Sequence, residues 1–158
     1  MIVWFSELEF ISIRYFETVR NLHEINLQDN LIKSLPEDTF NLNKELRSLN
    51  LGSNQIEKLP TRLLWNLAKL EGFVAERNKI EFLSTDLFRN NTNLQFINLN
   101  NNKIKEIGID FTNMSNIKIL GMGNVCANFY LTKKFNGTEL NKLVKDKCSF
   151  KNATVTKN

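Results

Sequence analysis

Residues 94–107 read LQFINLNNNKIKEI, and five of these fourteen positions are asparagine or glutamine set among leucines and isoleucines. Such a mixture is either a low-complexity, asparagine-rich segment or one copy of a motif that recurs along the chain. The rest of the sequence decides between these two interpretations, because a structural motif repeats its apolar and amide positions in register.

The motif recurs with a period of 24 residues, shortened to 23 in the last step. Successive copies begin at Leu22, Leu46, Leu70, Leu94 and Ile117. Apolar residues align at positions 1, 4, 6, 11 and 14 of each copy, and asparagine stands at position 9 in Asn30, Asn54, Asn78 and Asn102. Self-similarity at this period predicts a solenoid, in which each turn buries its apolar side chains against its neighbours.

Each copy has the pattern of a short strand followed by a bend. Apolar residues at positions 4 and 6, such as Ile97 and Leu99, predict a strand with one buried side. The asparagine at position 9 can both donate and accept hydrogen bonds, so it can satisfy backbone groups that a buried bend leaves unpaired. We therefore predict that the aligned asparagines are architectural. An aromatic and aliphatic column is predicted to belong to the core: Phe16, Phe40, Leu64, Phe88 and Phe111.

The recurring pattern LxxLxLxxNxIxxLPxxxF resembles the leucine-rich-repeat family, and in particular its 24-residue, extracellular-type repeats. The resemblance covers roughly residues 8–126. It implies an α/β fold, a right-handed curved solenoid with a parallel sheet on its concave face and a short carboxyl-terminal cap helix. It leaves the function open, because one fold serves many binding roles.

Both ends of the repeat array depart from the regular pattern. Leu8-x-x-Ile11-x-Ile13 predicts another strand, within an irregular repeat at residues 1–21. Regular repeats are expected over 22–125, followed by a cap at 126–150 and a polar, disordered tail at 151–158. In the cap, Thr138 is predicted to cap a helix whose apolar stripe is Leu140, Leu143 and Val144.

Cys126 and Cys148 are the two cysteines of the chain, and both fall in the predicted cap. The arrangement resembles the carboxyl-terminal cap of secreted repeat proteins, which implies a disulfide bond between them. Such a bond would stabilise the fold by roughly 2–4 kcal/mol. The alternative is a pair of unrelated buried thiols in a cytosolic protein.

Composition narrows the classes of partner. The 158 residues are 42% hydrophobic, and 21 basic against 17 acidic residues give a net charge of +4 without a run of five or six basic residues. We expect one domain that binds neither nucleic acid nor membrane. The first residues, MIVWFSELEF, are too briefly apolar for a signal peptide. Candidate glycosylation sites follow the N-x-S/T pattern: Asn90, Asn113, Asn136 and Asn152.

No arrangement typical of catalysis is found in the sequence. The chain contains one histidine, His23, at a variable repeat position where a solvated surface residue is expected. No second histidine or cysteine stands at metal-ligand spacing, and the carboxylates are scattered among variable positions. We therefore predict a protein that is not an enzyme and that holds no metal or cofactor.

The candidate binding surface follows from strand alternation. Positions 3, 5 and 7 of each copy are expected to point outward on the concave side. In the irregular repeat these positions would be Phe10, Ser12 and Arg14. Polar residues occupy the middle of the face, and apolar residues gather toward its carboxyl end. The predicted ligand-binding set is Val74, Glu76, Arg77, Phe96, Asn98, Asn100 and Ile119, with Phe96 as an exposed anchor ringed by polar groups.

The sequence thus predicts a non-catalytic module that recognises a protein ligand through its concave face. The resemblance to secreted insect repeat proteins and receptor ectodomains implies an extracellular location and a role in innate immunity. An intracellular scaffold or regulatory subunit with the same fold is the alternative, and it needs neither disulfide nor glycans. Neither the ligand nor the oligomeric state follows from the pattern.

Overall fold

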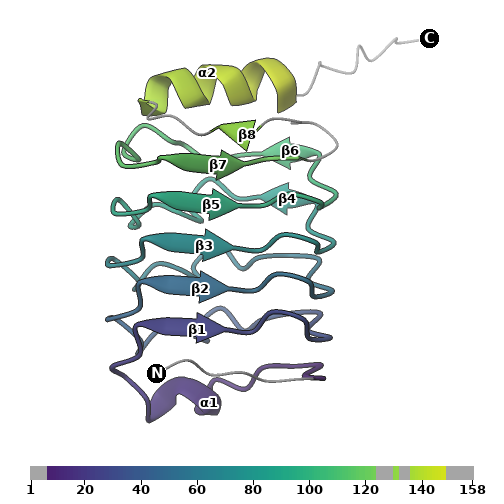
Figure 1. The fold of residues 1–158 in the computed structure, drawn as a ribbon, viewed down its shortest axis with the longest axis vertical. Coiled ribbons are helices and arrows are strands. Elements are labelled where there is room, and N and C mark those ends of the chain that lie inside the picture. Colours follow the sequence, from purple (N-terminus) through teal and green to yellow (C-terminus); the bar gives the residue numbers. More distant parts are fainter. Residues whose placement is uncertain (1–6, 124–129, 132–135, 149–158) are drawn as a thin grey trace, which may run out of the picture.

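The computed structural model describes residues 7–123, 130–131 and 136–148. The chain winds into a stack of similar turns, with the short helix α1 (Arg14–Glu17) at one end and α2 (Gly137–Cys148) at the other (Figure 1). Short strands lie one above another along one side of the stack. The architecture is the α/β solenoid that the repeat pattern predicts.

The main sheet contains six strands in the order β1-β2-β3-β5-β7-β8. Their bounds are Glu24–Asn26, Ser48–Asn50, Gly72–Val74, Phe96–Asn98, Ile119–Gly121 and Tyr130–Leu131. All neighbours are parallel except β7 and β8, which are antiparallel. The central residue of each repeat strand pairs with its counterpart in the next, as in Ile25 with Leu49. Equal repeat lengths produce this register.

A second, two-stranded parallel sheet lies on the other side of the turns (Figure 1). It pairs β4 (Phe82–Leu83) with β6 (Glu106–Ile107), in the register Leu83 with Ile107. Both paired apolar residues stand at repeat position 14. The sequence pattern did not predict this sheet, because a strand of two residues carries no alternation to detect.

The core runs through the middle of the stack. The predicted column, Phe16, Phe40, Leu64, Phe88 and Phe111, is buried throughout, which confirms its assignment to the core. The Phe16 and Phe40 ring centroids lie 5.4 Å apart. Phe88 also meets Phe73 of β3 edge-on, with centroids 5.5 Å apart. Aromatic contacts of this kind contribute about 0.5–1.5 kcal/mol beyond the area they bury.

The predicted strand at Leu8–Ile13 is wrong. Leu8 lies where Ile32 lies in the next turn: its backbone N–H donates to Asn30 at 3.0 Å, as the Ile32 N–H donates to Asn54 at 3.1 Å. Leu8 and Ile11 therefore stand at repeat positions 11 and 14, not 1 and 4. The error arose because both pairs of positions have the same three-residue spacing.

This register moves the first turn away from the predicted concave face. Phe10, Ser12 and Arg14 precede or begin α1, which lies outside the main sheet. Phe10 is 69% exposed, and it stands at repeat position 13, as Phe82 does three turns further along. The columns of outward residues therefore begin at β1.

The helix α2 covers the carboxyl end of the stack (Figure 1). Leu140 and Val144 are buried and Leu143 is half-buried, so the predicted apolar stripe faces the core. The predicted cap, Thr138, is wrong: Thr138 lies inside α2, and Asn136 caps the helix by accepting the Glu139 N–H at 2.8 Å. The antiparallel strand β8 was not predicted. Cys148 ends α2 and is buried, whereas Cys126, Asn152 and the tail at 151–158 lie outside the described residues.

Candidate binding face

The outward side chains of β1, β2, β3, β5 and β7, together with those just after each strand, form what we call the concave face. The central residue of each of these strands is fully buried, at 0% exposure: Ile25, Leu49, Phe73, Ile97 and Leu120. Their flanking residues are half-buried, except for Gly121, which is buried. Alternation along short strands thus turns the two flanking positions of each strand to the outer side of the sheet.

The aligned asparagines set the bend that ends each strand. The Asn54 Oδ1 accepts the Ile32 N–H of the preceding turn at 3.1 Å. Its Nδ2 donates to the carbonyls of Leu27, Leu51 and Gly52 at 2.8, 3.1 and 3.0 Å. Asn78 makes the corresponding four contacts. Each amide thus joins two turns and satisfies buried backbone groups that would otherwise be unpaired.

A left-handed residue precedes each of these asparagines. Asp29, Ser53, Arg77 and Asn101 have φ values of 57°, 51°, 52° and 56°. Non-glycine residues rarely adopt this conformation. The sequence did not predict it, because the four residues are of four different types. Arg77 was predicted to belong to the ligand-binding set. The structure places it in this turn, beyond the end of β3 and exposed, so it lies at the edge of the concave face.

The other predicted residues lie on adjacent strands. In the sheet, Phe96 of β5 pairs with Ile119 of β7, and Val74 of β3 pairs with Asn98 of β5. The side chains of Val74, Phe96 and Ile119 are half-buried. The sequence predicted an exposed Phe96, and the structure corrects this to a half-buried one. A half-buried ring held on a strand is better fixed in orientation than an exposed one.

Polar neighbours hold one another in place beside this apolar group. The Asn98 Nδ2 donates to the Glu76 carboxylate at 2.7 Å. The Asn98 Oδ1 accepts the Asn100 N–H at 3.1 Å, and the Asn100 Oδ1 accepts the Gly123 N–H at 2.6 Å. Glu76, Asn98 and Asn100 thus form one hydrogen-bonded chain across three turns, which orients the carboxylate.

A second amide chain, which the sequence did not reveal, crosses the amino-terminal half of the face. Asn50 Nδ2 donates to Gln28 Oε1 at 2.8 Å, and the Gln28 N–H donates to Asn26 at 3.0 Å. Asn50 also accepts the Gly52 N–H at 2.9 Å. The signal was available in principle, because amides recur at positions 5 and 7, but their pairing depends on how the turns stack.

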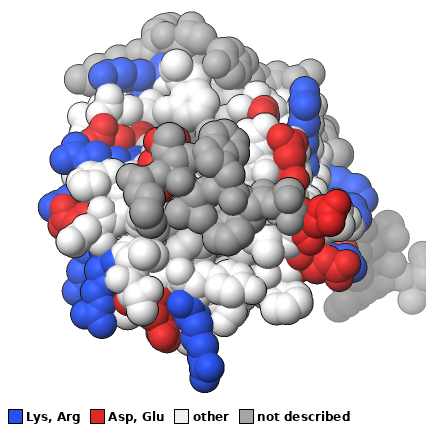
Figure 2. Space-filling view, turned by 60° about the horizontal axis from the view of Figure 1, so that its bottom comes forward, with Lys and Arg blue, Asp and Glu red and all other residues white. Residues whose placement is uncertain are grey.

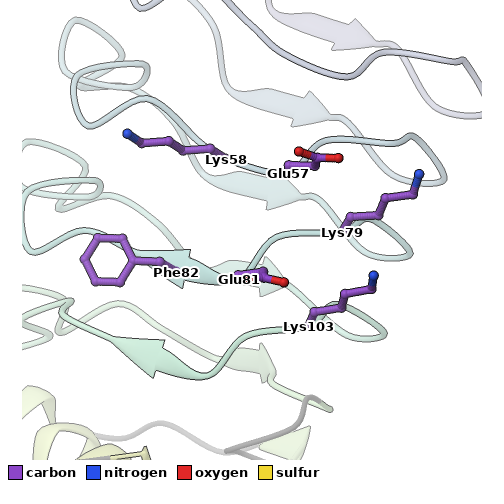
Figure 3. A pocket seen from close by; sticks show the side chains of 6 residues that line it. All are labelled: Glu57, Lys58, Lys79, Glu81, Phe82 and Lys103. Carbon is purple, nitrogen blue, oxygen red and sulfur yellow. The ribbon is translucent and has the colours of Figure 1, made fainter.

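A shallow groove of about 590 Å³ lies on the flank that follows the strands. Lys58 and Phe82 extend to one side of it and Lys79 and Lys103 to the other, with the carboxylates of Glu57 and Glu81 between them (Figure 3). Two of these residues have partners at its margin, since Glu81 pairs with Lys105 at 3.1 Å and Lys79 donates to Gln55 at 3.2 Å. The charges are mixed and do not converge on one point.

Charge elsewhere on the molecule is also mixed. Viewed toward its amino-terminal end, the molecule shows basic and acidic side chains interspersed around its rim (Figure 2). Within the described residues, no group of three or more His, Cys, Asp or Glu side chains could hold a metal ion. His23 is exposed, as predicted. Neither helix in the described part of the chain has the length and hydrophobicity needed to cross a membrane.

The described sequon asparagines are exposed. Asn90 donates through Nδ2 to the Trp65 carbonyl at 3.0 Å. Asn113 lies two residues after the buried Phe111, and Asn136 caps α2 through its Oδ1. All three lie away from the strands of the concave face.

Comparison with known proteins identifies the class. Residues 20–80 match the family model described as leucine rich repeat, and no curated protein sequence matches the chain. Among solved structures, the LRIM1/APL1C complex superposes with a TM-score of 0.68 at 23% identity, over 72% of this chain and 21% of that one. The fold of the described residues is thus that of a leucine-rich-repeat solenoid, and residues 20–80 match the leucine-rich-repeat family model.

Two further structures are similar. The leucine-rich repeat domain of APL1B gives a TM-score of 0.66 at 24% identity, covering 70% of this chain and 32% of that one. The TLR13–ssRNA13 complex gives 0.63 at 20% identity, covering 74% and 21%. The chain thus spans about a fifth to a third of the solved chains it matches, and the likeness to them concerns the fold.

Proposed function

We propose that this protein is a non-catalytic binding module that recognises a protein ligand through its concave face. The contact residues would be Val74, Glu76, Phe96, Asn98, Asn100 and Ile119, with Arg77 at the edge. The observation that carries the proposal is the half-buried apolar group of Val74, Phe96 and Ile119 beside the oriented carboxylate of Glu76. Apolar anchors next to ordered polar groups are typical of the energetic centres of protein interfaces.

The rigidity of the face supports the proposal. Its outward side chains stand on strands joined by parallel pairing, and the two amide chains restrict their rotamers. A surface that is ordered before binding loses little conformational entropy when a partner docks. Binding at this face would therefore require no rearrangement of the solenoid.

The charge of the face favours a protein over a nucleic acid. TLR13, one of the structural neighbours, is described in complex with a single-stranded RNA. Positions 3, 5 and 7 of the five repeat strands here include Glu24 and Glu76 but neither lysine nor arginine. Phosphate groups require basic side chains for neutralisation, so the face is better suited to a protein.

We further propose that the protein acts outside the cell, with Cys126 and Cys148 joined in the cap and glycans on the sequon asparagines. A role in innate immunity would fit this location. Exposure of Asn90, Asn113 and Asn136 away from the concave face supports the proposal, because glycans there would leave the binding surface open. An intracellular scaffold or regulatory subunit is the alternative.

Peptide selection tests the binding proposal. Random dodecapeptides displayed on phage would be selected on the wild-type protein, and the affinity of the recovered peptide would be measured by fluorescence anisotropy. We expect Phe96→Ala to weaken binding about thirtyfold, as loss of an interface anchor does. The free energy of unfolding should change by no more than about 1 kcal/mol.

Phe82→Ala is the matched control, because Phe82 is a 39% exposed phenylalanine in the flank groove. It should leave the affinity unchanged. A peptide that loses affinity with Phe82→Ala and keeps it with Phe96→Ala would move the binding site to the flank. A loss of stability well above 1 kcal/mol in Phe96→Ala would mean that Phe96 belongs to the core.

A further inference from the structure

Glycines on the concave face differ in what surrounds them. Four glycines stand at outward positions of the repeats: Gly52, Gly72, Gly121 and Gly123. None has a positive φ, so the backbone conformation does not require glycine at any of them. Their role must be sought in the space that the missing side chain leaves.

Neighbouring side chains occupy that space at three of the four positions. A Cβ added at Gly52 would lie 3.1 Å from Asn50 Oδ1 and 3.5 Å from Glu76 Cγ. At Gly121 it would lie 2.6 Å from the Asn100 Nδ2, and at Gly123 it would lie 3.0 Å from the Asn100 Oδ1. These glycines admit the amides and the carboxylate that form the hydrogen-bonded chains of the face.

Gly72 is different, because its space is open. The nearest atom to an added Cβ is the Ser48 Oγ at 3.9 Å, which is ordinary contact distance. In the sheet, Gly72 pairs with Ser48 on one side and with Phe96 on the other. The missing side chain therefore leaves a notch between Ser48 and Phe96, with Val74 two residues further along β3. Phe96 is the residue of β5 that lies beside this notch in the sheet.

We propose that this notch receives one apolar side chain of the protein partner, and that a basic group of the partner pairs with Glu76. The notch has the half-buried Phe96 as its neighbour in the sheet, which suits an apolar or aromatic side chain. Glu76 is the charged residue at positions 3, 5 and 7 of β2, β3 and β5, the strands at the notch, and it is acidic although the chain carries +4 overall. Charge complementarity thus points to a basic partner surface.

This inference rests on the proposed function and adds a specificity-determining position to it. Glu76 lies two residues after Val74 in the sequence, and the Asn98 Nδ2 donates to its carboxylate at 2.7 Å. The apolar notch and the oriented carboxylate therefore lie close together on β3 and its exit. We expect peptides selected on the wild type to carry a large apolar residue within a few positions of lysine or arginine.

Filling the notch tests the inference. Gly72→Leu places a side chain in the notch beside Phe96. The clearance of an added Cβ and the ordinary φ at Gly72 favour an undisturbed fold. The dodecapeptide selected on the wild type should bind Gly72→Leu about thirtyfold more weakly, with an unchanged melting temperature. Gly72→Ala fills less of the notch and should lower the affinity by a smaller factor. It also serves as the test if Gly72→Leu is poorly folded.

Glu24→Leu is the matched control, because Glu24 stands at the same repeat position on β1, two strands from the notch. It should leave the affinity for the selected peptide within about twofold. Glu76→Gln should weaken binding of the same peptide at low salt, and the difference from wild type should shrink as salt is raised.

The outcomes separate the two proposals. If Phe96→Ala weakens binding but Gly72→Leu and Gly72→Ala do not, the notch inference is wrong and the proposed function stands. If none of the three variants weakens binding, both are wrong. A selection that recovers no peptide on the wild-type protein also contradicts both. Selected peptides without basic residues, indifferent to Glu76→Gln, would overturn the assignment of a basic partner.

Discussion

At the scale of single residues, asparagine has several distinct roles in this protein. Asn54 and its counterparts bind backbone groups at the end of each strand, whereas Asn98 orients a carboxylate on the face. Asn43 and Asn91 form a further set at repeat position 22. Each is fully buried, and the Asn91 Nδ2 donates to the Leu64 and Leu67 carbonyls at 2.9 and 2.8 Å. Position within the repeat, rather than residue type, sets the role.

Replacing a buried asparagine of the strand-end set tests its architectural role. Asn54→Leu adds apolar surface but removes one acceptor and three donated bonds that join two turns. Each buried backbone group left unpaired costs about 1–3 kcal/mol. We expect the free energy of unfolding in urea to fall by about 3 kcal/mol.

Gln55→Leu is the control for Asn54→Leu, because Gln55 is the next residue and is half-buried on the flank. It should change the free energy of unfolding by no more than about 0.5 kcal/mol. Equal effects of the two substitutions would show that added hydrophobicity, rather than lost hydrogen bonds, accounts for the change.

At the scale of elements, α2 docks through a close backbone approach and a polar anchor. A Cβ on Gly137 would collide with the carbonyl group of Phe111 and with the Cα of Thr112. Asn141 accepts the Phe111 N–H at 2.8 Å and donates to Asp110 at 2.6 Å and to Thr112 at 3.1 Å. The first turn of the helix thus lies directly on the last repeat.

Gly137→Ala should displace the cap. The added methyl group meets backbone atoms that cannot move aside, so we expect a loss of about 3 kcal/mol in the free energy of unfolding. Gly72→Ala is the control, since its Cβ has 3.9 Å of clearance, and it should be close to neutral. Hydrogen exchange should locate the change in Gly137→Ala to α2. Unaltered exchange in α2 would contradict the close docking.

Acid should weaken the same docking. The Thr112 hydroxyl, the Thr112 N–H and the Asn141 amide donate to the Asp110 carboxylate and lower its pKa below the ordinary value of 3.8. A lowered pKa means that the carboxylate stabilises the fold fully above pH 3.8. That contribution is lost as the pH falls through the lower folded-state value.

Melting temperatures of the wild type and Asp110→Asn, measured from pH 6 to pH 2, test this pH dependence. The wild type should be the more stable above pH 4, and the difference should shrink as the pH falls below 3.8 toward the lower pKa of Asp110 in the folded protein. A difference that stays constant with pH would mean that the Asp110 charge does not contribute.

At the scale of the whole molecule, stability comes from stacking of similar turns. Three exposed ion pairs join adjacent turns across 24 residues: Arg47 with Glu71, Lys69 with Glu45, and Lys105 with Glu81. Exposed pairs of this kind contribute about 0–1 kcal/mol each. The continuous apolar core is therefore the main source of stability, and its carboxyl end depends on the cap.

The proposed location of the protein is testable on the intact chain. We expect the protein, secreted from insect cells behind an added leader peptide, to resist thiol alkylation under non-reducing conditions. Its mass should exceed that of the chain by an amount that a glycosidase removes. Two alkylated thiols on folded protein with unmodified asparagines would favour the intracellular alternative.

Periodicity was sufficient to predict the solenoid, the buried column and the cap helix. A repeat that places Leu or Ile at fixed positions can bury them only by stacking, so local pattern and global fold coincide there. The outward positions of the concave face followed from the same alternation. The position of the candidate residues on this face was therefore accessible from sequence, apart from the edge position of Arg77, and their role in binding stays a prediction.

Stacking between turns decided the remaining features. Leu8 and Ile11 match two places in the repeat equally well, and the Leu8 hydrogen bond to Asn30 selects one of them. The open notch at Gly72 and the filled space at Gly52 look alike in sequence, because both are glycines within strands or their exits. They differ in which neighbouring side chains occupy the space where a Cβ would lie. Contacts between residues about 24 positions apart are formed in space, and the local pattern that predicts a strand or a helix does not contain them.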